Sequence, residues 1–134
     1  SVTQVGHAVQ AYYTSQNAVY PVDTSAAAWE TALTASGEVT ALPSGVAYSV
    51  SGITACTENV RPATVGTWCY DNDATNGSII YARLESNSNN AKCPAATPKA
   101  WALYSTADGR AGVVCTAAAT TDLSPAAVGT TTYY

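Results

Sequence analysis

The sequence predicts an α+β fold in which one N-terminal α-helix packs on a sheet of three or four antiparallel strands. Apolar residues near the N-terminus recur at steps of three and four, the spacing of one stripe on an α-helix. From residue 42 onward the apolar period changes to two, which is typical of half-buried strands. Clusters of Asn, Asp and Gly separate the later strands and favour tight turns between them. At 134 residues the chain is predicted to form a single domain, residues 1–134.

The first helix is predicted to lead into the segment AYYTSQNAVYPVD, residues 11–23. Proline disfavours helical backbone in the residue before it and lacks the N–H group that a helix needs. The helix is therefore predicted to end before Pro21. Its apolar stripe consists of Val2, Val5, Ala8, Val9 and Tyr12.

A second, short helix is predicted over residues 26–37, AAAWETALTASG. Trp29 and Leu33 lie one turn apart on it, and Gly37 is predicted to close it. Three consecutive residues before it can each supply an N-cap oxygen: Asp23, Thr24 and Ser25.

Strands are predicted after the helices. The first lies in GVAYSVSGI, residues 45–53, where Val46, Tyr48 and Val50 alternate with small residues. A short strand is predicted over residues 68–70 and a longer one over residues 78–86. The final hairpin is predicted over residues 99–116, with its turn at Asp108-Gly109. The tail, residues 116–134, is predicted to be extended or irregular.

The composition argues against nucleic-acid binding. Charged residues make up only 10% of the chain, and the net charge is −4. The five basic residues are scattered, so no patch can neutralise a run of phosphates. The sequence contains no run of about 18 apolar residues, and its first residues lack the charged and apolar regions of a signal peptide.

The four cysteines are predicted to form two disulfides, which indicates an oxidising, extracellular environment. A zinc site is disfavoured because there is no C-x-x-C pair and His7 is the only histidine. Four cysteines allow three pairings. Neighbour pairing is predicted, because Cys56 and Cys69 bracket a loop containing Pro and Gly, and Cys93 and Cys115 bracket the final hairpin. Residues 93–115 would then form a disulfide-closed hairpin.

No catalytic residue is predicted. A Ser/His/Asp mechanism would need His7 as its base, and no G-x-S-x-G elbow presents a nucleophile. The segment DNDATNG offers Asp71, Asp73 and Asn76 as calcium ligands, but it lacks the distal Glu of an EF-hand loop. The same residue types form ordinary turns. The turn is the favoured interpretation, calcium is the alternative, and no cofactor is predicted.

Nine tyrosines and three tryptophans raise the alternative that exposed rings bind sugars. Trp29, Trp68 and Trp101 occupy periodic apolar positions, which favours packing in the core. Tyr133 and Tyr134, at an apparently free end, are the exception.

The order of these elements resembles the soluble domain of bacterial type IV pilins and of the related pseudopilins. The likeness rests on a tyrosine-rich helix end, a Tyr-Pro corner, a short helix, the strand GSIIYARLES and a final hairpin containing STADGRAG. It covers about the first 115 residues in element order. Four residues match the helix-end pattern of the family: Ala8, Tyr12, Tyr20 and Pro21. The middle strand gives a looser match: Tyr81, Leu84 and Glu85.

This resemblance implies a structural subunit of an extracellular type IV pilus filament, which supports adhesion, motility or uptake and has no enzymatic activity. The processing site and apolar segment of the family are absent from this chain. Residues 1–20 would therefore be the C-terminal half of a long first helix in a membrane-anchored precursor. That helix would bind other pilin subunits, and the chain without its apolar half is expected to be monomeric. The resemblance also implies a direction for each helix face, with Val2, Val5 and Val9 on the sheet and Gln4 and Gln10 toward neighbouring subunits.

Two alternatives stay open. The first is a major pseudopilin of a type II secretion system, which belongs to the same structural class. The second is a secreted carbohydrate-binding module. An apolar helix of about 20 residues behind a short basic leader, encoded upstream of Ser1, would favour the pilin, whereas a cleavable signal peptide or an enzyme domain would favour the module.

Overall fold

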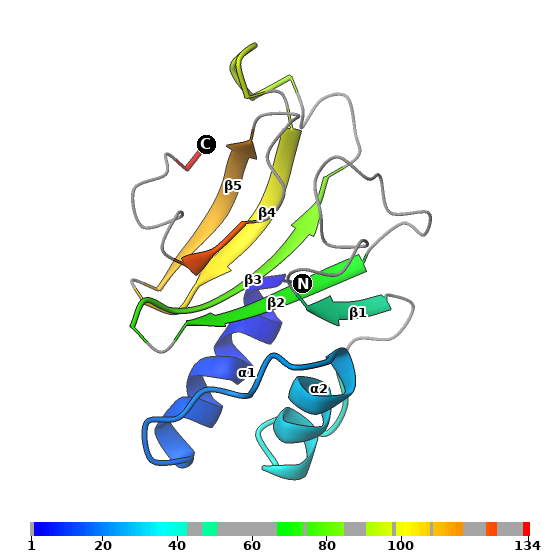
Figure 1. Ribbon diagram of the computed structural model, residues 1–134, viewed down its shortest axis with the longest axis vertical. Helices are drawn as coiled ribbons and strands as arrows, with labels where there is room; N and C mark the ends of the chain where they lie inside the picture. Colours follow the sequence, from blue (N-terminus) through cyan, green and yellow to red (C-terminus); the bar gives the residue numbers. More distant parts are fainter. Residues whose placement is uncertain are drawn as a thin grey trace.

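In the part of the chain that the computed structural model describes, two helices precede a five-stranded sheet (Figure 1). The structure describes residues 2–42, 47–50, 67–73, 75–84, 91–97, 99–107, 109–116, 123–125 and 133–134. The helices are α1 (Val2–Ser15) and α2 (Ala26–Ala35). The strands are β1 (Ala47–Val50), β2 (Thr67–Asp73), β3 (Gly77–Arg83), β4 (Lys99–Ser105) and β5 (Arg110–Thr116). The α+β class predicted from the sequence is confirmed.

The sheet is mixed, so the predicted antiparallel sheet of three or four strands is wrong in strand number and in one pairing. Its order is β1-β2-β3-β4-β5. Strand β1 runs parallel to β2, with Ala47 beside Thr67, and the other three pairs are antiparallel. The period-two pattern of a strand is the same in either direction, because both kinds of ladder point alternate side chains to opposite faces. Local pattern therefore could not decide how β1 pairs.

The helices cover one face of the sheet (Figure 1). Helix α1 lies against β3 and β4, and α2 lies beside β1. The stripe of α1 is buried as predicted at Val5, Ala8 and Val9, while the side chain of Val2 lies outside the described residues. The buried cluster on this face consists of Val5, Ala8, Val9, Trp29, Leu33, Val50, Tyr70 and Ile80.

The opposite face of the sheet is buried as well. Strand β3 contributes to both faces, which explains its continuous apolar run, because a strand covered on both sides does not alternate with polar residues. Tyr133 packs against this second cluster, and the N–H of Tyr134 donates to the Val113 carbonyl at 2.7 Å. The C-terminal tyrosines therefore do not form a free end. The second cluster consists of Cys69, Ile79, Tyr81, Trp101, Leu103, Val114 and Leu123.

Helix α1 ends at Ser15, so the predicted helical segment 1–20 is too long. Asn17 and Ala18 follow it with φ of 58° and 63°, in the left-handed region. The Ser15 hydroxyl donates to the Tyr12 carbonyl at 3.2 Å and so competes with the helical bonding pattern. Asn tolerates left-handed backbone better than most residues, but Ala does not, and its strain there costs about 1 kcal/mol.

The boundaries of α2 follow the predicted caps. Ser25 is its N-cap and accepts the Ala28 N–H on its side-chain oxygen at 3.2 Å. Gly37 follows the helix with φ of +82°, a conformation that glycine adopts without steric cost. The final hairpin also forms as predicted, with Gly109 at φ +67°, while Asp108 lies outside the described residues.

Gly6 allows α1 to approach the sheet closely. A Cβ atom at this position would lie 2.2 Å from Cδ1 of Tyr104 on β4. Replacing glycine by alanine in an open helix stabilises it by about 1 kcal/mol. Here we expect Gly6→Ala to destabilise the protein by about 1–2 kcal/mol in urea unfolding, because the buried ring must move. In a Tyr104→Ala background the same change should be neutral or stabilising, and a loss of the same size in both backgrounds would contradict the explanation.

Candidate functional site

The Tyr-Pro corner between α1 and α2 is tied to the sheet by Tyr70. The Tyr70 hydroxyl, on β2, donates to the Pro21 carbonyl at 2.8 Å and lies 3.1 Å from the Ser78 hydroxyl on β3. Ser78 Oγ is also 3.0 Å from Asn72 Oδ1. The Ser78 hydroxyl donates to Asn72 Oδ1, so it lies between the Tyr70 hydroxyl and the Asn72 side chain in one series of hydrogen bonds. The corner is thus held by a buried chain of hydrogen bonds.

A second contact fixes the residue that follows the corner. Asp23 Oδ2 accepts the backbone N–H of Asn72 at 3.0 Å. The charge-assisted bond joins the segment before α2 to the end of β2. Both contacts connect residues 49 positions apart in the chain, so they position the two helices relative to the sheet.

Gln10 faces the sheet, which corrects the prediction that it points toward neighbouring subunits. Its Nε2 donates to the Thr106 carbonyl at 3.1 Å, and its Oε1 accepts from the hydroxyl of Tyr104. Thr106 in turn exchanges hydrogen bonds with Ser78, whose N–H donates to Thr106 Oγ1 at 2.9 Å. Gln4 is exposed, and its predicted contact with neighbouring subunits stays a prediction. Helix α1 is therefore bonded to the end of the β4 strand as well as packed on it.

The pKa of Tyr70 is raised well above its usual value of 10.0, mainly by burial. Negative charge at Asp23, Tyr20 and Asp71 adds to this effect, and the Ser78 hydrogen bond opposes it. A raised folded-state pKa contributes stability that is complete below about pH 10 and is lost as pH rises above it.

We expect Tyr70→Phe to lower the free energy of unfolding by about 1–3 kcal/mol at pH 7, because the Pro21 carbonyl loses its donor. The variant should also lose less stability than the native protein between about pH 9.5 and 11, since the ionisable group is gone. Urea unfolding at each pH measures both effects. Parallel pH profiles for the two proteins would contradict this role of Tyr70.

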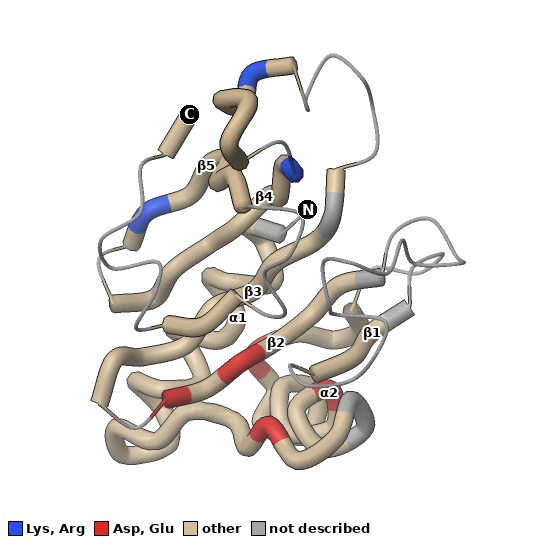
Figure 2. The backbone as a smooth tube through the Cα atoms, turned by 45° about the horizontal axis from the view of Figure 1, so that its top comes forward, with Lys and Arg blue, Asp and Glu red and all other residues tan. Residues whose placement is uncertain are grey.

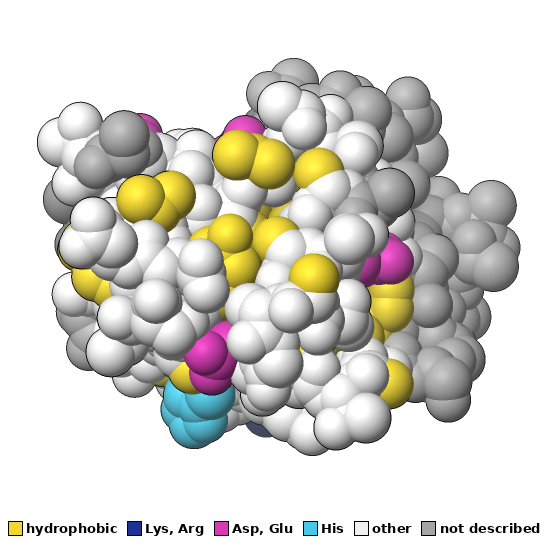
Figure 3. All heavy atoms as spheres, turned by 90° about the horizontal axis from the view of Figure 1, so that it is seen from below, with side chains coloured by type: hydrophobic (Ala, Val, Ile, Leu, Met, Phe, Trp, Pro, Cys, Tyr) yellow, Lys and Arg dark blue, Asp and Glu magenta, His cyan; other side chains and the backbone are white. Residues whose placement is uncertain are grey.

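The outer side of the corner exposes apolar side chains. Tyr13 and Tyr20 stack with ring centroids 4.3 Å apart. Val19 and Val22 are each 55% exposed, and Tyr13 is 36% exposed. Figure 3 views this helical end of the molecule, where hydrophobic side chains reach the surface among polar atoms. Exposed apolar groups close together are a feature of interaction surfaces.

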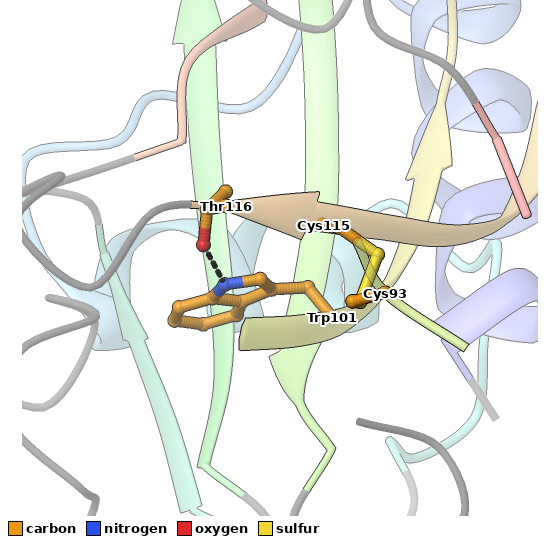
Figure 4. The surroundings of a disulfide bond; sticks show 4 residues. All are labelled: Cys93, Trp101, Cys115 and Thr116. Atoms are coloured by element: carbon orange, nitrogen blue, oxygen red, sulfur yellow. Dashed lines mark hydrogen bonds between the residues drawn. A yellow bond between two sulfur atoms is a disulfide. The ribbon is translucent and has the colours of Figure 1, made fainter. Parts of the chain in front are cut away.

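The far end of the molecule carries the disulfide between Cys93 and Cys115 (Figure 4). This pairing was predicted from the sequence and is confirmed. Beside it, Trp101 Nε1 donates to Thr116 Oγ1 at 2.9 Å. Cys69 is also disulfide-bonded, and its predicted partner Cys56 lies outside the described residues. The bridge from Cys93 holds the segment 91–97 against the end of β5.

The candidate calcium ligands form a turn at the end of β2. Asp73 Oδ1 accepts the N–H groups of Thr75 and Asn76 at 2.8 and 3.1 Å, and Asn76 Nδ2 donates to Asp73 Oδ2. These hydrogen bonds lower the pKa of Asp73, with the largest contribution from the Thr75 N–H and smaller ones from Asn76. Within the described ranges, no three His, Cys, Asp or Glu residues lie together as a possible metal site. The favoured turn accounts for Asp73 and Asn76, and calcium, with Asp71 as its third ligand, stays the untested alternative.

The remaining candidate residues make packing contacts within the fold. His7 is exposed and contacts the edge of the Tyr104 ring. Trp29 and Trp101 are buried in the two clusters, as the core interpretation predicted, and Trp68 is half-buried. Tyr133 lies under the Arg110 guanidinium, whose Cζ is 3.9 Å from the ring centroid.

A groove of about 500 Å³ lies between α2 and β1. Glu30 and Tyr48 line it together with Leu42 and three threonines, Thr31, Thr34 and Thr40. Burial raises the pKa of Glu30, and burial followed by the Glu30 charge raises the pKa of Tyr48. An aromatic ring beside hydroxyls and a carboxylate is the kind of surface that polyhydroxylated ligands contact.

The hydrogen bonds that hold the corner are not predicted by the sequence. The pattern predicts a strand around Tyr70 but gives no sign of its bond to Pro21, nor of the bonds made by Ser78, Thr106 and Gln10. The only available signal was the presence of polar side chains next to apolar strand residues, which does not identify their partners.

Within the described part of the chain, no helix has the length and apolar character needed to cross a bilayer. Comparison with protein-family models, with curated proteins and with solved structures finds no match to this chain.

Proposed function

We propose that the chain is a structural subunit of an extracellular filament of the type IV pilin kind, with no catalytic role. The observation that supports this most strongly is the attachment of α1. Its apolar stripe is buried on the sheet, Gln10 bonds to Thr106, and the corner after it is bonded to Tyr70. A helix anchored in this way transmits load from a filament core to the head domain.

The pseudopilin alternative shares this architecture and stays a proposal beside the pilin. The five-stranded mixed sheet is broadly compatible with either, although its strand number and its parallel β1–β2 pair depart from the pilin-like sheet expected from the resemblance.

The filament proposal is tested on cells that produce the protein. Antibodies raised against this chain should label sheared surface filaments in electron micrographs. The matched control is serum absorbed with the purified chain, which should remove the labelling. Signal confined to the culture medium, with unlabelled filaments, would refute the proposal.

We expect the purified chain to be monomeric at about 100 µM, as judged by multi-angle light scattering. Among the described residues, only four large hydrophobic side chains are exposed: Tyr13, Val19, Val22 and Tyr134. They do not form the long apolar stripe that stable polymerisation requires. Filaments assembled by the purified chain alone would contradict this expectation.

The groove beside Tyr48 supports a second candidate function, carbohydrate binding. Affinity electrophoresis in gels that contain soluble polysaccharides tests it. A binding module should be retarded, and Tyr48→Ala should abolish the retardation, while Tyr13→Ala near the end of α1 serves as the matched control. Unchanged mobility in all gels would leave the filament proposal as the explanation of the exposed aromatic rings.

A further inference from the structure

The turn between β2 and β3 contains the dipeptide Asn76-Gly77. Asn76 is exposed, and Figure 2 shows acidic positions on β2 as the strand approaches this turn. In an Asn-Gly pair the backbone nitrogen of the glycine can attack the side-chain amide carbon of the asparagine, because glycine has no side chain to hinder the approach. Asparagine is a thermolabile residue for this reason. The turn therefore exposes a reactive pair to water.

The fold requires glycine at position 77. Its φ is +86°, a conformation that glycine adopts without steric cost and that other residues rarely adopt. A Cβ atom there would also lie 3.1 Å from Oγ1 of Thr106 and 3.4 Å from Cβ of Ala107. A side chain that would slow the reaction thus fits neither the backbone conformation nor the available space.

Asp73 holds the side chain of the reactive asparagine. Its Oδ2 accepts a hydrogen bond from Asn76 Nδ2 at 3.2 Å, while its Oδ1 accepts the backbone N–H groups of Thr75 and Asn76. Bonds to a carboxylate are stronger than bonds to a neutral acceptor. Attack needs the amide carbon to meet the Gly77 nitrogen along a bonding direction. A side chain fixed by such a bond samples that orientation less often than a free one.

We propose that Asn76 is a site of spontaneous deamidation and that Asp73 slows this reaction in the folded chain. The Gly77 nitrogen loses its proton and forms a bond to Cγ of Asn76. The bond from Cγ to Nδ2 breaks, and Nδ2 leaves with that proton as ammonia, which produces a cyclic imide. Water then adds to the imide at Cγ to give aspartate, or at the backbone carbonyl to give isoaspartate. Water enters and ammonia leaves, so no oxidant or cofactor is needed.

Either product changes the contacts of the turn. Aspartate puts a second carboxylate where the Asn76 amide now donates to Asp73, so two acceptors meet without a proton between them. Isoaspartate lengthens the backbone immediately before β3. Ser78 follows closely, with its N–H bonded to Thr106 Oγ1 at 2.9 Å and its hydroxyl bonded to Asn72 Oδ1 at 3.0 Å. The modification therefore reaches the hydrogen bonds that hold the corner.

The test follows the conversion of the folded, full-length chain in mildly alkaline buffer. Mass spectrometry of proteolytic peptides locates the site, and enzymatic methylation of isoaspartate identifies that product. Asp73→Ser removes the carboxylate, while the serine hydroxyl can still accept the backbone N–H groups of the turn. We expect this variant to convert at Asn76 about two- to tenfold faster than the native chain, the factor that corresponds to the loss of one intramolecular hydrogen bond.

The matched control is Thr75→Ser, which changes an exposed side chain of the same turn and keeps both Asp73 and Asn76. It should convert at the native rate. Amide NMR spectra verify that the β2–β3 hairpin persists in both variants. A folded Asp73→Ser variant that converts no faster than the native chain, or one in which Asn72 converts faster than Asn76, would overturn the proposal.

The chain unfolded in urea separates the effect of the fold from that of the sequence. The hydrogen bond from Asn76 to Asp73 is lost on unfolding, so the native chain and Asp73→Ser should then convert at closely similar rates. Both should convert faster than the folded native chain. An equal acceleration by Asp73→Ser in the folded and unfolded chains would mean that the neighbouring charge, and not the hydrogen bond, controls the reaction, and would contradict the proposal.

The aged native chain gives a second measurement that needs no variant at Asp73. Its isoaspartate form, once isolated, should have a lower urea midpoint than the unmodified chain and shifted amide signals for Ser78 and Thr106. Asn76→Asp supplies the aspartate product for comparison and should retain more of the native stability. An isoaspartate form with native stability and unchanged amide signals would refute the predicted consequence for the corner. These outcomes are independent of the filament function.

Discussion

Trp29→Ala is expected to lower the free energy of unfolding by about 3–5 kcal/mol, the range for removing a large aromatic side chain from a core. Trp29 is completely buried and anchors α2 to the sheet. Its ring lies 5.2 Å from that of Tyr70 and 5.5 Å from that of Tyr48, and its Nε1 donates to the Ser49 carbonyl at 3.2 Å. The substitution removes these contacts and leaves a cavity between α2 and β1. Native domains have free energies of unfolding of about 5–15 kcal/mol, so this substitution would remove a large share of the stability of the protein.

The matched control is Trp68→Ala, which removes the same side chain from a half-buried position. Trp68 touches Tyr48 edge to face, with ring centroids 5.9 Å apart, but keeps part of its ring in solvent. Its loss should cost clearly less than that of Trp29. Urea midpoints measured with unchanged m-values give both free energies. Equal losses at the two positions would mean that α2 is not anchored through Trp29.

Removing the disulfide by Cys93→Ala/Cys115→Ala is expected to destabilise the chain by about 3 kcal/mol. The two cysteines are separated by 22 positions. A cross-link over a loop of this length restricts the unfolded chain, and its removal returns that entropy to the unfolded state. The hairpin itself should persist, because β4 and β5 stay paired from Lys99 to Thr116 and Trp101 keeps its bond to Thr116.

Unfolding measured with and without reductant separates the contribution of the Cys93–Cys115 disulfide from that of the disulfide formed by Cys69. Reductant should destabilise the double variant further, because Cys69 is also disulfide-bonded. Hydrogen exchange should show faster opening of the segment around Lys92, while amides in the middle of β4 stay protected to the level of global unfolding. A double variant as stable as the native chain, or one whose β4 amides exchange freely, would contradict this account.

Two milder substitutions test the corner and the close packing of α1 on the sheet without unfolding the whole domain. Tyr70→Phe reports on the bond to Pro21, and Gly6→Ala reports on the distance between α1 and Tyr104.

The sequence was sufficient where the controlling contacts are local. The stripe of α1 was read correctly at Val5 and Val9, because helical side chains three and four positions apart share one face. Ser25, one of the three candidate N-cap residues, caps α2, and Gly37 directly follows its C-cap residue Ser36, as the backbone requirements of single residues predict.

Features that depend on residues far apart in the chain were decided by the tertiary structure. The parallel pairing of β1 with β2, the inward turn of Gln10 and the bond from Tyr70 to Pro21 are of this kind. Gln10 and Thr106 are 96 positions apart, and no local pattern distinguishes a glutamine that reaches a distant carbonyl from one that faces solvent. Polar side chains bond to whichever group the packed core brings within reach, and in this chain the packing of α1 and α2 on the mixed sheet determines those groups.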